Sequence, residues 1–398
     1  MARCNWTKAE VALESTQDPR LMALAERALS HYVNKTTDRA PTTMQMPVSA
    51  YSDTARYDRE RKRIFGSLPI AVALSIELPD RGSYKAMQVL DVPLLLVRDE
   101  QGVARCFLNV CRHRGARLCE SGRAQTRIIA CPYHAWTYNL QGELVARYGA
   151  DSFGEITQQA YSLTALPCEE RAGFLWVSLD QTPFDIDQWL GDFAVELGTL
   201  ALQDWHIYAQ RELPGPGWKV TMDGYLEAYH HNMLHGQTVG QMTVGNLMVL
   251  DTYGPHQRLT FGRKSLGELA RQPRKLWRPQ DHIRLIHSGF PNLSVSGIVG
   301  GFCLVSQIFP GPTAHTTLTV QTVLCAKPPQ TDAEIASAED FSAMVLQAVK
   351  DEDYPVGFGV QEGILSQANT HFTFGRNESA LQNYHRWVAY FMGEEISQ

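Results

Sequence analysis

No stretch of the sequence is apolar for long enough to cross a bilayer. The longest apolar runs, 68–76 and 297–308, fall well short of the roughly 18 residues that a membrane-spanning helix needs. The first 20 residues contain no apolar core of a secretion signal. Basic residues do not cluster and the formal net charge is only −6, which indicates neither nucleic acid nor an anionic membrane as a partner. We therefore expect a cytoplasmic protein with no membrane and no nucleic-acid partner.

Cysteine is also sparse, with eight residues in a chain of 398. In a cytoplasmic protein thiols stay reduced, and paired cysteines more often bind metal than form disulfides. Hydrophobic residues make up 44% of the sequence and charged residues 20%, which is typical of a packed globular protein. This length predicts two or three domains.

The apolar pattern changes twice along the chain. Residues 1–45 have helical spacing, 46–180 form short β-rich runs broken by turn residues, and 181–398 mix both patterns. We predict an α+β protein: an N-terminal helical segment that packs on the last domain, an all-β domain, and a C-terminal α+β domain with an antiparallel sheet and flanking helices. Helices of the last domain are expected at 184–200, 222–240, 331–349 and 378–392.

Two Cys/His pairs lie in the β-rich segment. Cys111 and His113 are separated by one residue, and Cys131 and His134 by two, with seventeen residues between the pairs. Zinc and iron both accept thiolate and imidazole ligands. Zinc sites usually pair Cys with Cys and His with His, whereas each loop here offers one of each. This order favours a [2Fe-2S] cluster with two thiolates on one iron and two imidazoles on the other.

A second group of candidate ligands follows in the last domain. On a helix Glu227 and His230 would share a face, and His235 would lie about one and a half turns further on. A local unwinding after His231 would bring both imidazoles to one metal. The alternative is a pair of polar surface residues, and His231 itself is expected at the surface or beside the ligands.

Two histidines and one carboxylate form the facial triad of non-haem Fe(II) oxygenases, which leaves coordination positions open. The carboxylate would come from a separate segment, 350–354, which offers Asp351, Glu352 and Asp353. A solvated acidic turn is the alternative for this segment.

These motifs resemble a known family. The stretches 109–116 and 131–136 closely resemble the Rieske domain of the ring-hydroxylating oxygenases, although Ala135 stands where that family usually carries Gly. The family's third iron ligand is the second member of an acidic pair followed eight residues later by Gln, which matches Asp353 and Gln361. The resemblance extends from about residue 41 to 391.

The resemblance implies a role for each motif. It makes 46–180 a Rieske [2Fe-2S] domain with ligands Cys111, His113, Cys131 and His134, and 181–398 a mononuclear iron domain with ligands His230, His235 and Asp353. Glu227 then matches the carboxylate that bridges an iron-ligand histidine to a cluster histidine, His134, of a neighbouring subunit. Asp223 matches a polar position near the iron ligands, where a hydrogen-bonding catalytic role is expected.

The implied activity is O₂-dependent oxygenation of a small molecule. The resemblance implies that NAD(P)H supplies electrons through a separate reductase or ferredoxin, and that the chain forms a homotrimer, with or without a β-subunit. An electron-transfer Rieske protein would need only about a quarter of this length. A zinc-stabilised binding protein is the third class, and it would be colourless.

The substrate is left open between two classes. Apolar residues after His235 and in the predicted sheet would suit an aromatic or hydrophobic compound, undergoing hydroxylation, dihydroxylation or demethylation, although each of them can equally be a core residue. They are Val239, Met242, Val244, Leu247, Met248, Leu250, Ile286, Phe290, Leu293, Val295 and Ile298. Glutamate at position 227 resembles instead the branch that acts on choline-, betaine- or carnitine-like quaternary ammonium compounds. An aromatic cage would be expected there, and Tyr225 and Tyr229 do not establish one.

Overall fold

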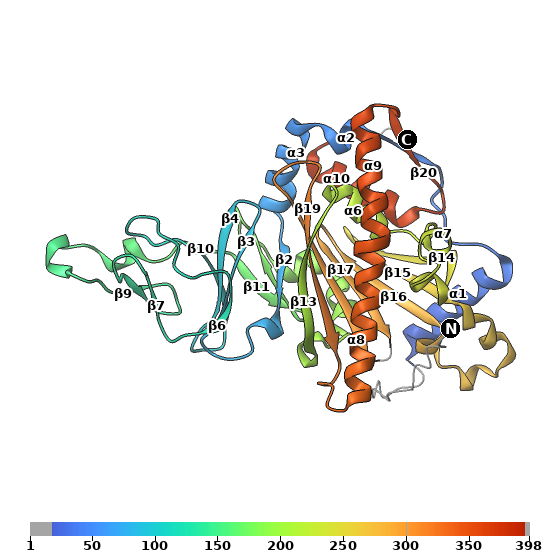
Figure 1. The fold of residues 1–398 in the computed structure, drawn as a ribbon, viewed down its shortest axis with the longest axis horizontal. Coiled ribbons are helices and arrows are strands. Elements are labelled where there is room, and N and C mark those ends of the chain that lie inside the picture. Colours follow the sequence, from blue (N-terminus) through green and yellow to red (C-terminus); the bar gives the residue numbers. More distant parts are fainter. Residues whose placement is uncertain (1–17, 300, 395–398) are drawn as a thin grey trace. The chain divides into compact units, whose positions relative to one another are not determined.

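A computed structural model describes residues 18–299 and 301–394 (Figure 1). The chain divides into two compact units, one formed by 61–204 and the other by the residues before 61 together with those from 205 onward. The N-terminal helical prediction over 1–17 lies outside the described residues. None of the helices in the described part of the chain combines the length and apolar character that crossing a bilayer requires.

The unit 61–204 is built mainly from three antiparallel sheets. Their strand orders are β10-β5-β4-β3-β6, β11-β12-β2 and β7-β8-β9. The strands are β2 Ile70–Leu74, β3 Ser83–Val89, β4 Val92–Arg98, β5 Ala104–Leu108, β6 Gly122–Gln125, β7 Ile129–Ala130, β8 Thr137–Tyr138, β9 Leu144–Ala146, β10 Ala165–Leu166, β11 Cys168–Arg171 and β12 Phe174–Val177. The helical segments are η1 Arg61–Gly66, η2 Ser75–Glu77, η3 Ala150–Phe153, η4 Gln158–Tyr161, α4 Ile186–Leu190, α5 Asp192–Gly198 and η5 Leu202–Asp204.

The other unit is organised around one seven-stranded antiparallel sheet. The strand order is β13-β19-β18-β17-β16-β15-β14, and a separate pair joins β1 to β20. The strands are β1 Met44–Pro47, β13 His206–Gly215, β14 Thr243–Tyr253, β15 His256–Arg263, β16 Ile283–Gly289, β17 Leu293–Val299, β18 Phe302–Pro310, β19 Thr317–Cys325 and β20 His371–Phe374. The helical segments are α1 Pro19–Asn34, α2 Ser49–Ser52, α3 Thr54–Glu60, α6 Trp218–Tyr225, α7 His231–Leu234, η6 Val239–Gln241, η7 Lys264–Arg271, η8 Arg274–Leu276, η9 Pro279–Asp281, α8 Asp332–Leu346, η10 Gln347–Asp353, α9 Tyr354–Ser366 and α10 Ser379–Met392.

Apolar faces explain why helices cover this sheet. Helix α8 packs Phe341 and Val345 against β18 and β19, where Phe302 and Val323 are buried. It begins with a capping box at Thr331, which satisfies backbone N–H groups that the first turn leaves free. In Figure 1 the red-orange helices α8 and α9 follow one another across the sheet. The predicted antiparallel sheet with flanking helices is confirmed.

Helix α1 belongs to this second unit. Asp18 caps its N-terminus and Lys35, in the left-handed region, ends it. Its buried face, which includes Met22 and Ala25, packs against Leu247 of β14. The N-terminal helix therefore contributes to the core of the unit that carries the C-terminal sheet.

The segment around residue 230 is not the continuous helix 222–240 that the spacing predicts. Helix α6 ends at Tyr225, the non-helical residues 226–230 follow, and α7 begins at His231. The Glu227 carboxylate accepts hydrogen bonds from the backbone N–H groups of Tyr229 and His230. A side chain that bonds its own neighbouring backbone competes with helical bonding, which accounts for the break.

Candidate metal centres

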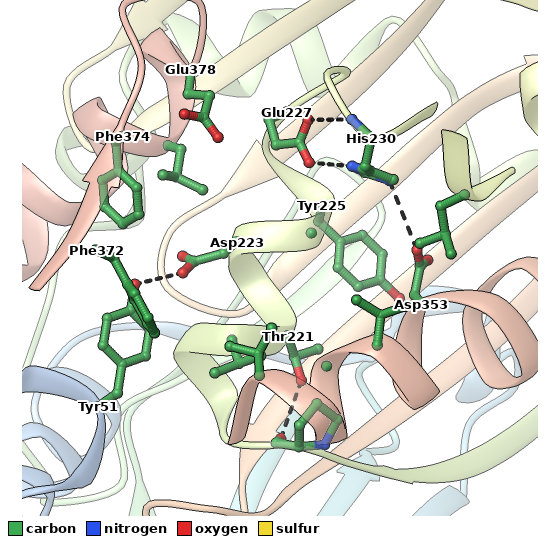
Figure 2. Close-up of a pocket in the computed structure, with 18 of the residues that line it drawn as sticks. Tyr51, Thr221, Asp223, Tyr225, Glu227, His230, Asp353, Phe372, Phe374 and Glu378 are labelled. Atoms are coloured by element: carbon green, nitrogen blue, oxygen red, sulfur yellow. Dashed lines mark hydrogen bonds and ion pairs between the residues drawn. The ribbon is translucent and has the colours of Figure 1, made fainter. Parts of the chain in front are cut away.

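Two segments far apart in sequence bring three metal-ligating side chains together. His230 precedes α7, His235 follows it, and Asp353 ends the π-helical segment η10. One ligand atom from each lies within 4.8 Å of the others. His235 Nε2 is 3.1 Å from His230 Nε2 and 3.0 Å from an Asp353 oxygen, and His230 Nε2 is 3.8 Å from the same oxygen. Figure 2 shows His230 facing Asp353.

The outer nitrogens of both imidazoles are held by carboxylates. His230 Nδ1 bonds Glu227, and His235 Nδ1 lies 2.6 Å from Glu352. A histidine that donates its Nδ1 proton to a carboxylate presents an unprotonated Nε2, which is the usual second-layer arrangement of metal-bound histidine. The Nε2 atoms of His230 and His235 and the nearby Asp353 oxygen all act as hydrogen-bond acceptors. Among the described residues, these three atoms share no donor. These residues therefore fit a divalent iron, which two imidazoles and one carboxylate would hold on one side.

Electrostatics around His235 also favour a cation. Burial alone lowers the pKa of His235, but Asp353 and Glu352 outweigh it and raise the pKa above its ordinary value. The side chain is 3% exposed, so water screens these charges weakly. A positive charge is stabilised at this position, whether carried by a proton or by a metal ion.

The acidic candidates of the segment 350–354 have separate positions. Asp351 is exposed, Glu352 bonds the outer edge of His235, and Asp353 faces both imidazoles. A π-helical turn is often found at functional sites, and here it turns two successive carboxylates toward the same imidazole. The sequence pattern alone could not separate Glu352 from Asp353 as the ligand.

Two cavities border the triad. The first has an empty volume of about 1150 Å³, part of it solvent, and lies between α2, α6, α9 and β20 (Figure 2). Its walls include Tyr51, Asp223, Glu227, Phe372, Phe374 and Glu378. Asp223 accepts hydrogen bonds from Tyr51 Oη at 2.5 Å and from His385 Nε2 at 2.7 Å. Within the described chain, no hydrogen bond or ion pair joins Asp223 to the triad.

The second cavity lies between the triad and the sheet. It has an empty volume of about 620 Å³, part of it solvent. Its walls are Gly224, Tyr225, His230, His231, His235, Val239, Thr243, Phe261, Arg284, Ile286, Ser296, Leu304, Val345, Ala348, Val349 and Asp353. His231, expected at the surface or beside the ligands, is 9% exposed and lines this cavity. Burial, with the nearby His230, lowers its pKa well below the ordinary value, so its ring stays neutral.

Few of the apolar residues expected to line a substrate pocket do so. Val239 and Ile286 border the second cavity, whereas the side chains of Leu247 and Val295 are buried in the core. The side chain of Ile298 lies outside the described residues. Tyr225 lines both cavities and Tyr229 is 63% exposed, so the two tyrosines form no shared cage.

In the other unit, two loops of similar form carry the Cys/His pairs. Cys111 O accepts the N–H of Gly115, and Cys131 O accepts the N–H of Ala135, both at 3.0 Å. Gly115 has φ +76° and Ala135 has φ +52°, so both loops turn through the left-handed region. Ala135 holds the same place in its loop as Gly115 does in the other. Because glycine adopts a positive φ without steric cost, this position explains why the family usually carries Gly there. Ala135 adopts the same turn at a steric cost.

The four side chains of these loops converge. The rings of His113 and His134 have centroids 4.9 Å apart, and His113 stacks on Trp136. Burial raises the pKa of the Cys111 thiol, and the neighbouring Cys131 raises it further, so two thiolates here need a cation between them. His134 Nδ1 is buried without a hydrogen-bond partner. A free imidazole nitrogen and two adjacent buried thiols fit the [2Fe-2S] cluster.

Comparison with known proteins agrees with both centres. The family described as Rieske [2Fe-2S] domain matches residues 69–156, and the one described as ring hydroxylating alpha subunit (catalytic domain) matches residues 202–394. The chain therefore carries both a Rieske [2Fe-2S] domain and a ring-hydroxylating alpha-subunit catalytic domain. The resemblance seen in the motifs is thereby confirmed, as is the α+β fold class, and the two domains imply a Rieske cluster and a mononuclear iron.

Two relatives of this chain are named after quaternary ammonium substrates. The glycine betaine monooxygenase oxygenase subunit of Chromohalobacter salexigens is 31% identical over 198 residues, covering 50% of this chain and 44% of the relative. The carnitine monooxygenase oxygenase subunit of Acinetobacter baumannii is 32% identical over 192 residues, covering 48% and 52%. The chain thus spans about half the length of the curated relatives it matches.

A solved structure shows the same fold. The quaternary ammonium Rieske monooxygenase CntA in complex with L-carnitine superposes with a TM-score of 0.75 at 23% identity, covering 89% of this chain and 96% of that one.

Proposed function

We propose that this chain is the oxygenase component of an O₂-dependent enzyme that oxidises a small organic molecule. The observation that carries the proposal is the convergence of His230, His235 and Asp353 at the wall of a cavity, in a chain that also carries a Rieske domain. When bound, the cluster would supply electrons one at a time and the mononuclear iron would supply the open positions for O₂.

The protein's own residues prepare this chemistry. Glu227 and Glu352 fix the imidazole orientations, so that both Nε2 atoms point to the same place. Apolar walls such as Phe261 and Leu304 limit water around the triad, which protects a reactive site from wasteful turnover. Asp353 closes the third side of the triad with a negative charge.

We further propose that electrons come from NAD(P)H through an external reductase or ferredoxin, and that they cross between subunits of a homotrimer. The bridging group would be Glu227, whose carboxylate bonds His230 Nδ1 and lines the first cavity. The cluster histidine facing it would be His134 of a neighbouring copy. Asp223, held by Tyr51 and His385, would keep the wall of that cavity in shape.

Between the two substrate classes, the relatives favour the quaternary ammonium compounds. The glycine betaine and carnitine enzymes that the chain matches support that alternative. The aromatic substrate remains a prediction that the relatives described above do not support. Oxidation of a methyl or methylene carbon next to the ammonium nitrogen is the reaction that this class would undergo.

One experiment tests the oxygenase directly. The purified protein, reconstituted with iron and sulfide, should show a visible [2Fe-2S] spectrum that bleaches on anaerobic reduction. Admitting O₂ to the reduced protein with glycine betaine, carnitine or an aromatic panel should give substrate-dependent product rather than peroxide alone. A colourless, zinc-replete protein, or reoxidation that never yields product, contradicts the proposal.

A further inference from the structure

One half-buried cation that lines the second cavity has no carboxylate counter-charge among the described residues. Arg284 lies on β16, in the strand Ile283–Gly289, and its side chain lines the cavity that also contains the triad. Within the described chain no carboxylate forms an ion pair with its guanidinium. Its Nε is buried without a hydrogen-bond partner, and the hydrogen bond that the side chain does make runs from Nη2 to Ser296 Oγ.

This arrangement is unfavourable in the free protein. A guanidinium carries five N–H donors, and removing it from water without acceptors or a counter-charge is costly. Burial lowers the pKa of Arg284 to about 10, and the neighbouring Arg263 adds to the lowering. At neutral pH Arg284 nevertheless stays protonated. The fold therefore holds a fixed positive charge at the cavity wall.

The surroundings of Arg284 contrast with those of two other arginines in the same unit. Arg211 on β13 donates from Nε to Gln321 and from both terminal nitrogens to Ser342. Arg258 is paired with Asp251. Arg211 thus makes three hydrogen bonds to protein groups and Arg258 has a carboxylate counter-charge, whereas among the described residues Arg284 has the Ser296 hydroxyl and no carboxylate.

We propose that Arg284 binds a carboxylate of the substrate and so orients the opposite end toward His230, His235 and Asp353. This rests on the proposed oxygenase function and narrows its substrate class. Ser296, from the neighbouring strand β17, holds Nη2 of the guanidinium, and Nη1 has no hydrogen-bond partner among the described residues. Apolar side chains such as Phe261 and Leu304 contact the carbon skeleton between the two ends.

The charge distribution supports an anion in this cavity rather than in the first one. Asp353, one of the three triad residues, is the only carboxylate on its described wall, whereas Asp223, Glu227 and Glu378 line the first cavity. An anionic substrate is repelled there and attracted by Arg284. In a site with low polarity, a paired guanidinium and carboxylate also form two parallel hydrogen bonds, which sets direction as well as affinity.

The test compares acids with their neutral isosteres. Calorimetry on the anaerobic holoprotein would use L-carnitine, glycine betaine and anthranilate, each beside its primary amide. Wild type should bind at least one acid about 10-fold more tightly than the matching amide. Arg284→Gln should weaken binding of that acid by about 10- to 100-fold, as for a lost charge-assisted hydrogen-bond pair, and leave the amide nearly unchanged. Arg284→Lys, which keeps the charge but loses the planar fork, should fall between them.

Matched controls separate this role from folding and from the oxygenase function. Arg211→Gln removes another half-buried arginine of the same sheet and should leave the acid-to-amide ratio at its wild-type value. The cluster spectrum and the iron content show whether each variant is folded and loaded. An Arg284→Gln protein that is folded and keeps the wild-type acid-to-amide ratio overturns the proposal, as does a wild type that favours no acid. Failure of the oxygenase proposal would instead appear as reduced protein that gives no product with O₂ in any variant.

Discussion

The ring of His235 lies between two carboxylates that are adjacent in sequence: Glu352 is 2.6 Å from Nδ1, and Asp353 is 3.0 Å from Nε2. One imidazole thus has one nitrogen held outside the metal position and the other directed into it. Thr238 donates to the same Glu352 oxygen at 2.5 Å, so this carboxylate is itself fixed. Glu352 therefore orients the His235 ring, whereas Asp353 faces the metal position.

The first prediction concerns Glu352. Glu352→Gln keeps an acceptor for His235 Nδ1 but removes the charge, so iron should bind about 10- to 100-fold more weakly while the site still forms. Competition with a graded series of chelators, followed by iron analysis, measures the change. Thr238→Val, which removes only the hydroxyl that holds Glu352, should have a smaller effect in the same direction.

The second prediction distinguishes the proposed iron ligand Asp353 from the nearby acid Asp351. Asp353→Ala should lose the mononuclear iron and retain the visible cluster spectrum, because the two centres lie in different units of the chain. Asp351→Ala, at the exposed acid two residues earlier, should keep the iron of both centres. Metal analysis of the two variants side by side decides the assignment, and iron retained by Asp353→Ala would move the ligand to Glu352.

A third prediction addresses Glu227. Glu227→Gln should leave the iron content of both centres near that of the wild type but reduce product formation by at least about 10-fold, because the proposed bridge between the centres would lose its charge. Glu227→Asp, which keeps the carboxylate on a shorter side chain, should restore part of the rate. Single-turnover kinetics of pre-reduced protein is the appropriate measurement. Full turnover by the Gln variant would rule out the inter-subunit bridge.

The loop of Cys131 supplies a prediction about stability. At Ala135 the left-handed conformation costs about 1–2 kcal/mol, whereas glycine loses about 0.5–1 kcal/mol more backbone entropy on folding. Ala135→Gly should therefore stabilise the cluster-bearing unit by up to about 1 kcal/mol. Gly115→Ala is the reverse change in the partner loop, where an added Cβ meets no heavy atom within 4 Å, and it should destabilise by a similar amount. Thermal unfolding followed at the cluster absorption measures both.

The last prediction concerns the reduction potential of the cluster. Tyr138 Oη lies 3.3 Å from Cys111 Sγ and accepts the backbone N–H of Arg112 at 3.0 Å, so its own proton is free for the sulfur. A hydrogen bond to a thiolate stabilises the reduced, more negative cluster. Tyr138→Phe should lower the potential by roughly 40 mV, equivalent to about 1 kcal/mol. Tyr133→Phe, whose hydroxyl makes no hydrogen bond within the described residues, should leave a redox titration unchanged.

Sequence reasoning reached some parts of this site because their ligands are close in the chain. Cys111 and His113 share one short loop, so their spacing alone restricts the geometry. His230 and His235 could be paired for the same reason, although the chain unwinds before His230 rather than after His231. The break in the helix depends on the hydrogen bonds that the Glu227 side chain accepts from the backbone. Helical periodicity in the sequence does not indicate such bonds.

Other parts could not be read from the pattern. Without the family resemblance, which points to Asp353, choosing between Glu352 and Asp353 requires the π-helical phase of η10, and a wider helical turn leaves no signature in residue spacing. Arg284 sits in a strand otherwise rich in apolar residues, and alternation along a strand does not distinguish a cavity wall from a packed core. The sole sequence signal was a single charge inside an otherwise buried strand.

The division of the chain also determines the order in which its two units can fold during synthesis. Residues 61–204 are synthesised before the strands that form the sheet of the other unit. Strand β1 cannot pair until β20 has been synthesised, because Met44 of β1 pairs with Phe374 of β20. At about 5–20 residues per second, the ribosome needs roughly 10–40 s to finish the rest. The cluster-bearing unit can thus fold, and receive its iron and sulfide, before the second iron site exists. A nascent chain halted near residue 240 would be coloured but would lack Asp353 and so the complete triad for the mononuclear iron.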